Sequence, residues 1–259
     1  MKRKFLSVFA GLLFPLCSSA QIYDSFVDNS ALSEWYGDNS RFLISEDNRL
    51  QLNDPDKLGK SYVAFPSTAM NNAEWSLSME LQFRPSSSNY MRFFLCSDSP
   101  VLSEALNGYF LQVGNTNRQI LLYRMSNGST KILGRSIEDR LDRSSISLSL
   151  KVIRSEEGEW RVYSRLNDEI SFTEEFVVKD TMFENSFFSG IYCKYSKTNS
   201  DKFYFDDLYI DGTALSDFIA PKVEKFSISD SSIILQLSER IDCDAFSYEL
   251  QNLSYYESY

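Results

Sequence analysis

The sequence feature that most constrains the fold is a two-residue alternation of apolar and polar side chains. In the run WSLSMELQF at 75–83, every odd-numbered residue is apolar and every even-numbered one is serine, glutamate or glutamine. Successive side chains on a strand point to opposite faces of a sheet, so this strand has one buried and one wet face. Such a strand belongs in an antiparallel sheet that covers one side of a core.

Runs of this kind recur along most of the chain and are separated by turn residues, as in SNGST at 126–130. Aromatic residues, which favour strands, make up 15% of the chain. No segment keeps a long 3.6-residue apolar period, and the best helical candidate is PVLSEALN at 100–107, within a loop insertion. We therefore predict an all-β fold, an antiparallel two-sheet β-sandwich. The expected strands are 61–66, 75–83, 91–96, 108–114, 119–125, 145–154, 159–166, 187–195 and 202–210.

The first twenty residues, MKRKFLSVFAGLLFPLCSSA, join a basic start to a short apolar stretch and end in small residues. This pattern predicts a secretory signal peptide over 1–20, and its apolar part is too short to span a bilayer. We expect an exported chain without membrane insertion. The formal net charge is −10 and no basic stripe interrupts it, which argues against nucleic acid as a partner.

The numbers of cysteine and histidine residues limit which disulfides, catalytic groups and metal sites the chain can form. After the signal peptide the chain keeps Cys96, Cys193 and Cys243, an odd number at wide spacing, so no disulfide framework is predicted. A bridge between Cys96 and Cys193 and a pair of buried free thiols both stay open. Because the chain has no histidine, Ser-His-Asp catalysis and zinc sites built on imidazole are excluded.

Two long stretches, 74–124 and 188–212, resemble the N-terminal domain of large secreted bacterial surface proteins that carry a lamin-tail domain. The motifs that carry the resemblance are the tryptophan strand, RPSSSNYMR, LNGYFLQVG and KFYFDDLYI. The resemblance implies a concanavalin A-like, laminin-G-type jelly roll over 21–213. It also implies a secreted, periplasmic or outer-surface location in a Gram-negative bacterium.

The segment after the jelly roll has a different character. IAPKVEKFSISDSSIILQLSERIDCDAFSYEL, at 219–250, is similar to the opening strands of the bacterial Ig-like domains that follow such jelly rolls. This implies a linker over 214–221 and a partial Ig-like β domain over 222–259. Some 40 residues are too few for an independent sandwich.

Catalytic acids are not expected. Glycan hydrolases of this architecture hold an acid and a nucleophile on one strand in a Glu-x-Asp pattern, and the chain contains no Glu-x-Asp. Adjacent acids such as Glu174 and Glu175 would point to opposite faces of a strand, so we interpret them as solvated charge. We predict no catalytic residue and no enzyme activity.

Asp206 and Asp207, in KFYFDDLYI, would face opposite sides of a regular strand. In carbohydrate-binding jelly rolls this closing strand lies beside the N-terminal strand, and an aspartate there often helps to hold a structural calcium ion. The resemblance therefore implies a calcium site made by Asp206 or Asp207 with Asp24 or Asp28, and no other cofactor. The alternative is that these aspartates accept hydrogen bonds from loop backbone.

Sugar rings pack on aromatic faces, and Trp35 and Tyr36 in the loop-like SEWYGDN are the candidate platform, with core packing as the alternative. We expect a non-catalytic exported module that binds a glycan or another surface polymer, or the structural head of a surface protein. Two alternatives stay open: a glycan hydrolase or lyase with an atypical acidic site, and a truncated gene product without an independent role.

Overall fold

The computed structural model of the chain describes residues 22–27, 30–167, 169–213, 223–228 and 233–237. The chain divides into two compact units, and the larger one, Ser19–Asp217, contains the sandwich. The predicted linker over 214–221 and Asp28 lie outside the described residues.

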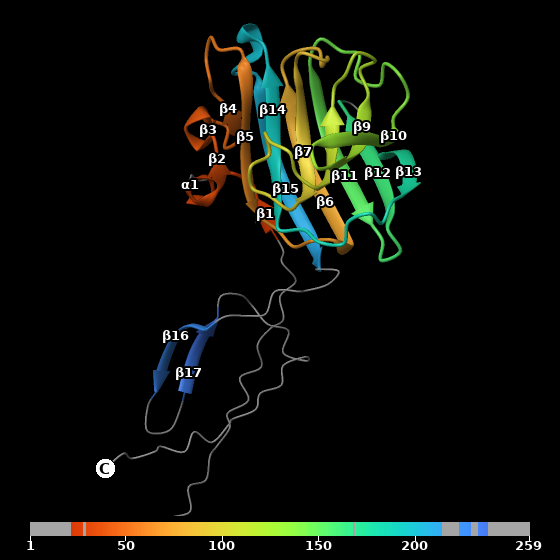
Figure 1. The fold of residues 1–259 in the computed structure, drawn as a ribbon. Helices are drawn as coiled ribbons and strands as arrows, with labels where there is room; N and C mark the ends of the chain where they lie inside the picture. Colours follow the sequence, from red (N-terminus) through yellow and green to blue (C-terminus); the bar gives the residue numbers. More distant parts are fainter. Residues whose placement is uncertain (1–21, 28–29, 168, 214–222, 229–232, 238–259) are drawn as a thin grey trace, which may run out of the picture. The chain divides into compact units, whose positions relative to one another are not determined.

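Two antiparallel sheets face each other in the larger unit (Figure 1). Sheet A has the strand order β13-β12-β11-β6-β15-β4-β3, with β1 paired to β15, and sheet B has the order β10-β9-β8-β7-β14-β5-β2. This arrangement confirms the predicted fold class. Sheet A comprises β1 (Ile22–Asp24), β3 (Phe42–Ile44), β4 (Leu50–Leu52), β6 (Asn71–Leu81), β11 (Ile146–Arg154), β12 (Glu159–Leu166), β13 (Thr173–Lys179) and β15 (Phe203–Thr213). Sheet B comprises β2 (Tyr36–Gly37), β5 (Gly59–Pro66), β7 (Tyr90–Ser97), β8 (Gly108–Val113), β9 (Ile120–Ser126), β10 (Ser129–Arg135) and β14 (Phe188–Tyr195).

The core lies between the sheets and follows the alternation of the sequence. On β6 the odd-numbered side chains from Ala73 to Leu81 are buried, and the even-numbered ones are half-exposed. Trp75 stacks on Trp160 of β12, with ring centroids 5.6 Å apart. Each large apolar side chain buried in this way stabilises the fold by about 1.5–3 kcal/mol. The facing sheets are therefore held together by the residues that the alternation marked as apolar.

All nine predicted strands are present, with bounds that differ by a few residues. The predicted helix at 100–107 is wrong, because this segment is an irregular loop. Leu102 and Leu106 are buried four residues apart, a spacing that also fits one face of a helix and explains the error. The helical segments among the described residues are α1 (Ser30–Glu34) and the 3-10 turns Asn39–Arg41 and Lys197–Asn199.

The two described cysteines, Cys96 and Cys193, are buried free thiols. Cys193 on β14 lies opposite Met91 of β7, and Met91 is five residues away from Cys96 along that strand. At about 3.3 Å per residue this is far beyond the Cα separation that a disulfide tolerates. The sheet register therefore excludes a bridge between Cys96 and Cys193 and leaves both as buried free thiols.

A separate hairpin is described beyond the sandwich. Its strands β16 (Val223–Ile228) and β17 (Ile233–Leu237) pair antiparallel with each other. The Ig-like assignment of this region stays a prediction. No helix among the residues described is long and apolar enough to cross a membrane.

Candidate binding site on the outer face of sheet B

The outer face of sheet B, which points away from the core, carries a second apolar cluster. On β7, Phe93 and Leu95 belong to the core, so Arg92 and Phe94 beside them point outward. The buried members of the outer cluster are Ala64, Tyr90, Phe94, Leu102, Leu106, Phe110, Met125 and Tyr192, and Tyr62 and Tyr123 pack against it. A sheet face that is exposed to solvent usually carries polar residues, so we expect this apolar face to be covered by another segment or to bind a ligand.

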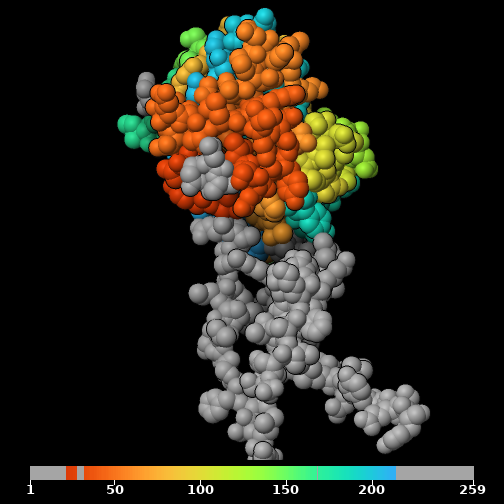
Figure 2. Space-filling model, turned by 90° about the vertical axis from the view of Figure 1, so that its left-hand side faces the viewer, coloured from red at the N-terminus to blue at the C-terminus, as the bar shows by residue number. Residues whose placement is uncertain are grey.

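Part of the cover comes from residues 98–107, which we call the 98–107 loop. Its ends are joined, because Asp98 accepts hydrogen bonds from both the backbone N–H and the side-chain amide of Asn107 at 2.8 and 2.7 Å. Leu102 and Leu106 anchor the loop on the cluster. The loop, yellow in Figure 1, crosses in front of sheet B, and it stands out from the side of the domain in Figure 2.

A pocket of about 350 Å³ remains between this loop and the sheet, and we call it the outer-face pocket. This volume lies near the lower end of the range for ligand sites in proteins. The lining residues are Lys60, Tyr90, Arg92, Leu102, Ser103, Glu104, Ala105, Met125, Gly128 and Tyr192.

The floor of the pocket is a stack of aromatic rings around one guanidinium. The carbon Cζ of Arg92 lies 5.3, 4.6 and 5.4 Å from the ring centroids of Tyr90, Phe110 and Tyr192. Burial raises the pKa of Tyr192, so its hydroxyl is neutral at physiological pH. The floor is thus rigid and cationic, and the polar groups of Lys60 and Glu104 stand beside it.

Sequence reasoning missed this site. Tyr90 and Arg92 sit in the motif RPSSSNYMR, which was used only to recognise the family, whereas Leu102 and Ser103 were taken as part of a helix. A signal was present, because Tyr90, Arg92 and Phe94 occupy alternate positions that share one strand face. It could not show that a distant loop would make the opposite wall.

The proposed aromatic platform has two different environments. Trp35 is half-buried and packs on Phe65, with centroids 4.5 Å apart, and edge-on against Phe26. Tyr36 is 49% exposed on the edge strand β2, where it meets Phe188 in a T-shaped contact at 5.5 Å. Neither residue lines the outer-face pocket. Their part in binding stays a prediction.

The expectation that Asp206 and Asp207 face opposite sides of a regular strand is wrong, because β15 has a bulge at this point. Between Asp206 and Tyr209 the pairing with β6 shifts by one residue, and Asp207 takes a left-handed conformation with φ of 48°. The buried side chains are therefore odd-numbered before the bulge, at Phe203 and Phe205, and even-numbered after it, at Leu208 and Ile210. Neither aspartate points into the core: Asp206 is half-exposed and Asp207 is exposed.

The bulge brings Asp24 of β1 close, since Asp24 lies opposite Leu208. Asp206 accepts a hydrogen bond from the N–H of Asp207, and Asp24 accepts one from the N–H of Phe26. Burial is the main cause of a raised pKa at Asp206, and Asp207 and Asp24 add to it by charge repulsion. The described residues contain no group of three or more acidic or cysteine side chains arranged to hold a metal ion.

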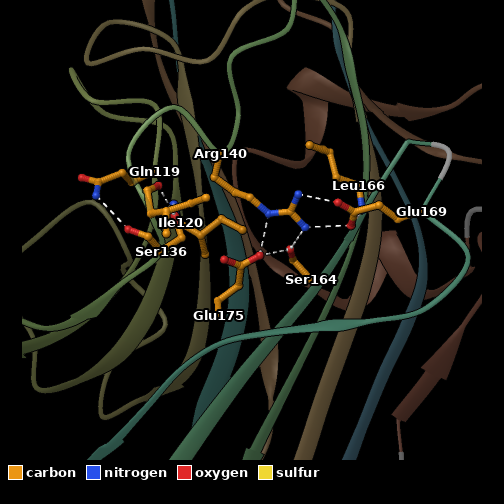
Figure 3. A network of polar contacts seen from close by, with 9 residues as sticks. Gln119, Ile120, Ser136, Arg140, Ser164, Leu166, Glu169 and Glu175 are labelled. Carbon is orange, nitrogen blue, oxygen red and sulfur yellow. Dashed lines mark hydrogen bonds and ion pairs between the residues drawn. The ribbon is translucent and has the colours of Figure 1, made fainter.

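A further acidic cluster, shown in Figure 3, is neutralised by one arginine. Arg140 donates from Nε to Glu175 at 2.6 Å and from its terminal nitrogens to Glu169 at 2.5 and 2.7 Å. Ser164 also donates to Glu175. The prediction of solvated charge is therefore wrong for Glu175, whose side chain is only 4% exposed, and holds for Glu174 at 43%. The network ties β13 and β12 to the loop before β11.

No family model matches the chain, and no curated protein matches it. Solved structures do. The exoplasmic/lumenal domain of VIP36 with bound Ca²⁺ and mannose has a TM-score of 0.56 at 9% identity, over 81% of this chain and 91% of that one. The carbohydrate recognition domain of Emp47p has a TM-score of 0.50 at 12% identity, covering 74% and 95%. A galectin-like protein from Bacillus subtilis has a TM-score of 0.52 at 13% identity, covering 73% and 94%.

These likenesses show the fold: the sandwich is a concanavalin A-like, galectin-like jelly roll. The identities of 9 to 13% carry no statement about ligands. The site must therefore be argued from the residues of this chain.

Proposed function

We propose that the chain is an exported, non-catalytic β-sandwich module that binds a glycan at the outer-face pocket. The observation that carries the proposal is the pocket itself, in which Lys60, Arg92, Ser103 and Glu104 converge on a space of sugar size above a rigid aromatic floor. Sugar hydroxyls need several donors and acceptors at fixed positions, and such groups on a rigid sheet supply them. Two of the similar structures are named for mannose binding or carbohydrate recognition, which supports the choice of ligand class.

A binding role fits the pocket better than hydrolysis does. Glycoside hydrolysis uses two carboxyl groups, about 5 to 9.5 Å apart, on either side of the scissile bond. Among the described residues that line the pocket, Glu104 is the one carboxylate. The Glu169 and Glu175 pair is bound by Arg140 and lies outside the pocket lining.

The wider setting belongs to the same proposal. The predicted signal peptide over 1–20 and the resemblance to lamin-tail-domain surface proteins support a place in the periplasm or on the outer surface of a Gram-negative cell. The jelly roll over 21–213 would then be the binding head, and 222–259 a partial Ig-like unit. A calcium ion at Asp24, Asp206 and Asp207 would stabilise the strand pair β1–β15. It would not contact the glycan, since none of these residues lines the pocket.

A glycan array followed by calorimetry on the best hit tests the function. Ala105→Trp fills the pocket from an exposed position on the 98–107 loop. We expect it to weaken binding by about tenfold or more, which corresponds to about 1.4 kcal/mol. Ser171→Trp, which adds the same ring to an exposed loop on the sheet A side, is the matched control and should bind within about twofold of wild type.

Two results would contradict the proposal. If Ala105→Trp binds the hit as tightly as the control, the ligand sits elsewhere. If incubation with the hit releases cleaved sugar, and the release depends on one buried acid, the protein is an enzyme.

A further inference from the structure

We propose that the outer-face pocket selects a sugar that carries a carboxylate group, and that Arg92 is the residue that recognises this group. The inference rests on the proposed function and makes its ligand class more specific. Three independent observations support it: how Arg92 is held, what it lacks, and which charges lie around it.

Arg92 is held in one orientation before any ligand arrives. Three aromatic rings pack around its guanidinium, and its Nε donates a hydrogen bond to Oε1 of Gln112 at 3.0 Å. Gln112 is itself fixed, because its amide donates to the carbonyl of Gly114 at 2.8 Å. A preorganised guanidinium loses little conformational entropy when it binds, so its geometry can discriminate between ligands.

Arg92 lacks the carboxylate partner that several other arginines of the sandwich have. Arg49, Arg124 and Arg140 each hold a carboxylate within 4 Å. Across the described part of the chain, no acidic side chain comes that close to Arg92, and its terminal nitrogens have no hydrogen-bond acceptor. A planar guanidinium with both terminal nitrogens open matches the two oxygens of a carboxylate.

The surrounding charges favour an anion. Lys60 and Lys194 lie opposite each other on β5 and β14, and Tyr90 of β7 is the next residue in the same row. The Nζ of Lys194 is 5.4 Å from the ring centroid of Tyr90. Two cations, Lys60 and Arg92, line the pocket against Glu104, and Lys194 lies beside Tyr90, although the whole chain has a formal net charge of −10. The lining residues thus carry one more positive than negative charge, opposite in sign to the net charge of the chain, which favours an acidic ligand.

Matched pairs of sugars test the inference by calorimetry on the full exported chain. The probes are an oligogalacturonate and the same oligosaccharide with its carboxylates reduced to alcohols, and sialyllactose against lactose. Sulfated lactose tests whether a sulfate can replace the carboxylate. We expect at least one carboxylated probe to bind about tenfold tighter than its neutral partner, and the preference to shrink in high salt.

Three variants assign the preference to Arg92. Arg92→Gln should remove it, and Arg92→Lys, which keeps the charge but not the planar fork, should lose most of it. Arg135→Gln removes the same charge from an exposed position on β10 outside the pocket lining and should keep the preference. Far-ultraviolet circular dichroism and a thermal melt show that each variant is folded, and Arg92→Lys still tests the inference if Arg92→Gln unfolds.

Each result has one meaning. Equal binding of acid and neutral partners, blocked by Ala105→Trp, would overturn the inference and leave the proposed function standing. Tighter binding of the sulfated probe, or an unchanged preference in Arg92→Lys, would also overturn it. No binding of any array glycan or probe would overturn both proposals.

Discussion

Arg140, in the loop before β11, and Arg161, on β12, each contact two glutamates but differ in burial, and this contrast shows where charge matters for stability. Arg140 is 12% exposed and holds Glu169 and Glu175, whereas Arg161 is 43% exposed and holds Glu159 and Glu174. Ion pairs at the surface contribute little, but removing one partner of a buried pair leaves an uncompensated charge.

Arg140→Met should therefore lower the free energy of unfolding by about 3 kcal/mol at pH 7, because Glu175 stays buried without its cation. Arg161→Met is the matched control and should change stability far less. The hydrogen bond from Arg140 lowers the pKa of Glu169, so the stability from this pair is present at neutral pH and is lost as the pH falls below the ordinary glutamate range. Urea unfolding at pH 7 and at about pH 2.5, well below the ordinary glutamate pKa, measures this, and equal losses in both variants would contradict it.

A second prediction at the level of single residues concerns Asp206. Burial raises its pKa, so its carboxylate costs free energy above the folded-state pKa, and the cost vanishes once the pH falls below the unfolded-state value. Asp206→Asn keeps the acceptor for the N–H of Asp207 and removes the charge. We expect a small gain in melting temperature at pH 7 that disappears at pH 3.

Asp207→Asn, on the same bulge and exposed, is the control and should show a smaller gain, because it removes the charge repulsion on Asp206 but leaves that buried carboxylate in place. The same pair of variants tests the predicted calcium ion. If calcium chloride raises the melting temperature of the wild type and Asp206→Asn lowers it in calcium, then the aspartates hold the ion, and the account given by burial alone is wrong.

At the scale of whole elements, the 98–107 loop is the part of sheet B most open to a direct test. Leu102 is buried against Phe110 and its neighbours in the outer cluster. Its Cδ1 lies 2.7 Å from where a Cβ on Gly190 would stand, and the carbonyl of Val63 lies 2.4 Å from the same point. The loop can pack closely on β14 only because residue 190 has no side chain.

Leu102→Ala should cost about 2–4 kcal/mol through loss of buried contacts and should also weaken glycan binding, since Leu102 lines the pocket. Leu141→Ala removes a fully buried leucine that lies in the main core and not in the pocket lining, so it should cost stability while leaving affinity unchanged. Chemical unfolding and calorimetry on the two variants separate these effects. If both lose the same affinity, the loop does not shape the site.

What the sequence could predict at this scale follows from what is local. Alternation within one strand predicted β6, β11 and β12 because neighbours in the chain determine which face is apolar. It could not predict that β6 lies between β11 and β15, since pairing across a sheet joins residues far apart in the chain. The bulge at Asp207 could not be predicted for a related reason, because its extra residue is recognised only by comparison with the register of β6.

At the scale of the whole molecule, the described strands of the sandwich form one unit that ends with β15 at Thr213. A chain of residues 21–217 should therefore melt at the same temperature as residues 21–259 and bind the same glycan. Differential scanning calorimetry on both forms checks this. A loss of more than about 5 °C on truncation would show that residues after 217 stabilise the sandwich.

The pairing of β1 with β15 has a mechanical consequence. The two strands run antiparallel, with Ile22 opposite Ile210 and Asp24 opposite Leu208, so the backbone enters and leaves the sandwich at the same end of this ladder. A load that pulls those two points apart acts along the hydrogen bonds and breaks them one after another, as in unzipping, and not all at once, as in shearing. Among the described residues β1 pairs with β15 at three positions, so it would peel away under a small force.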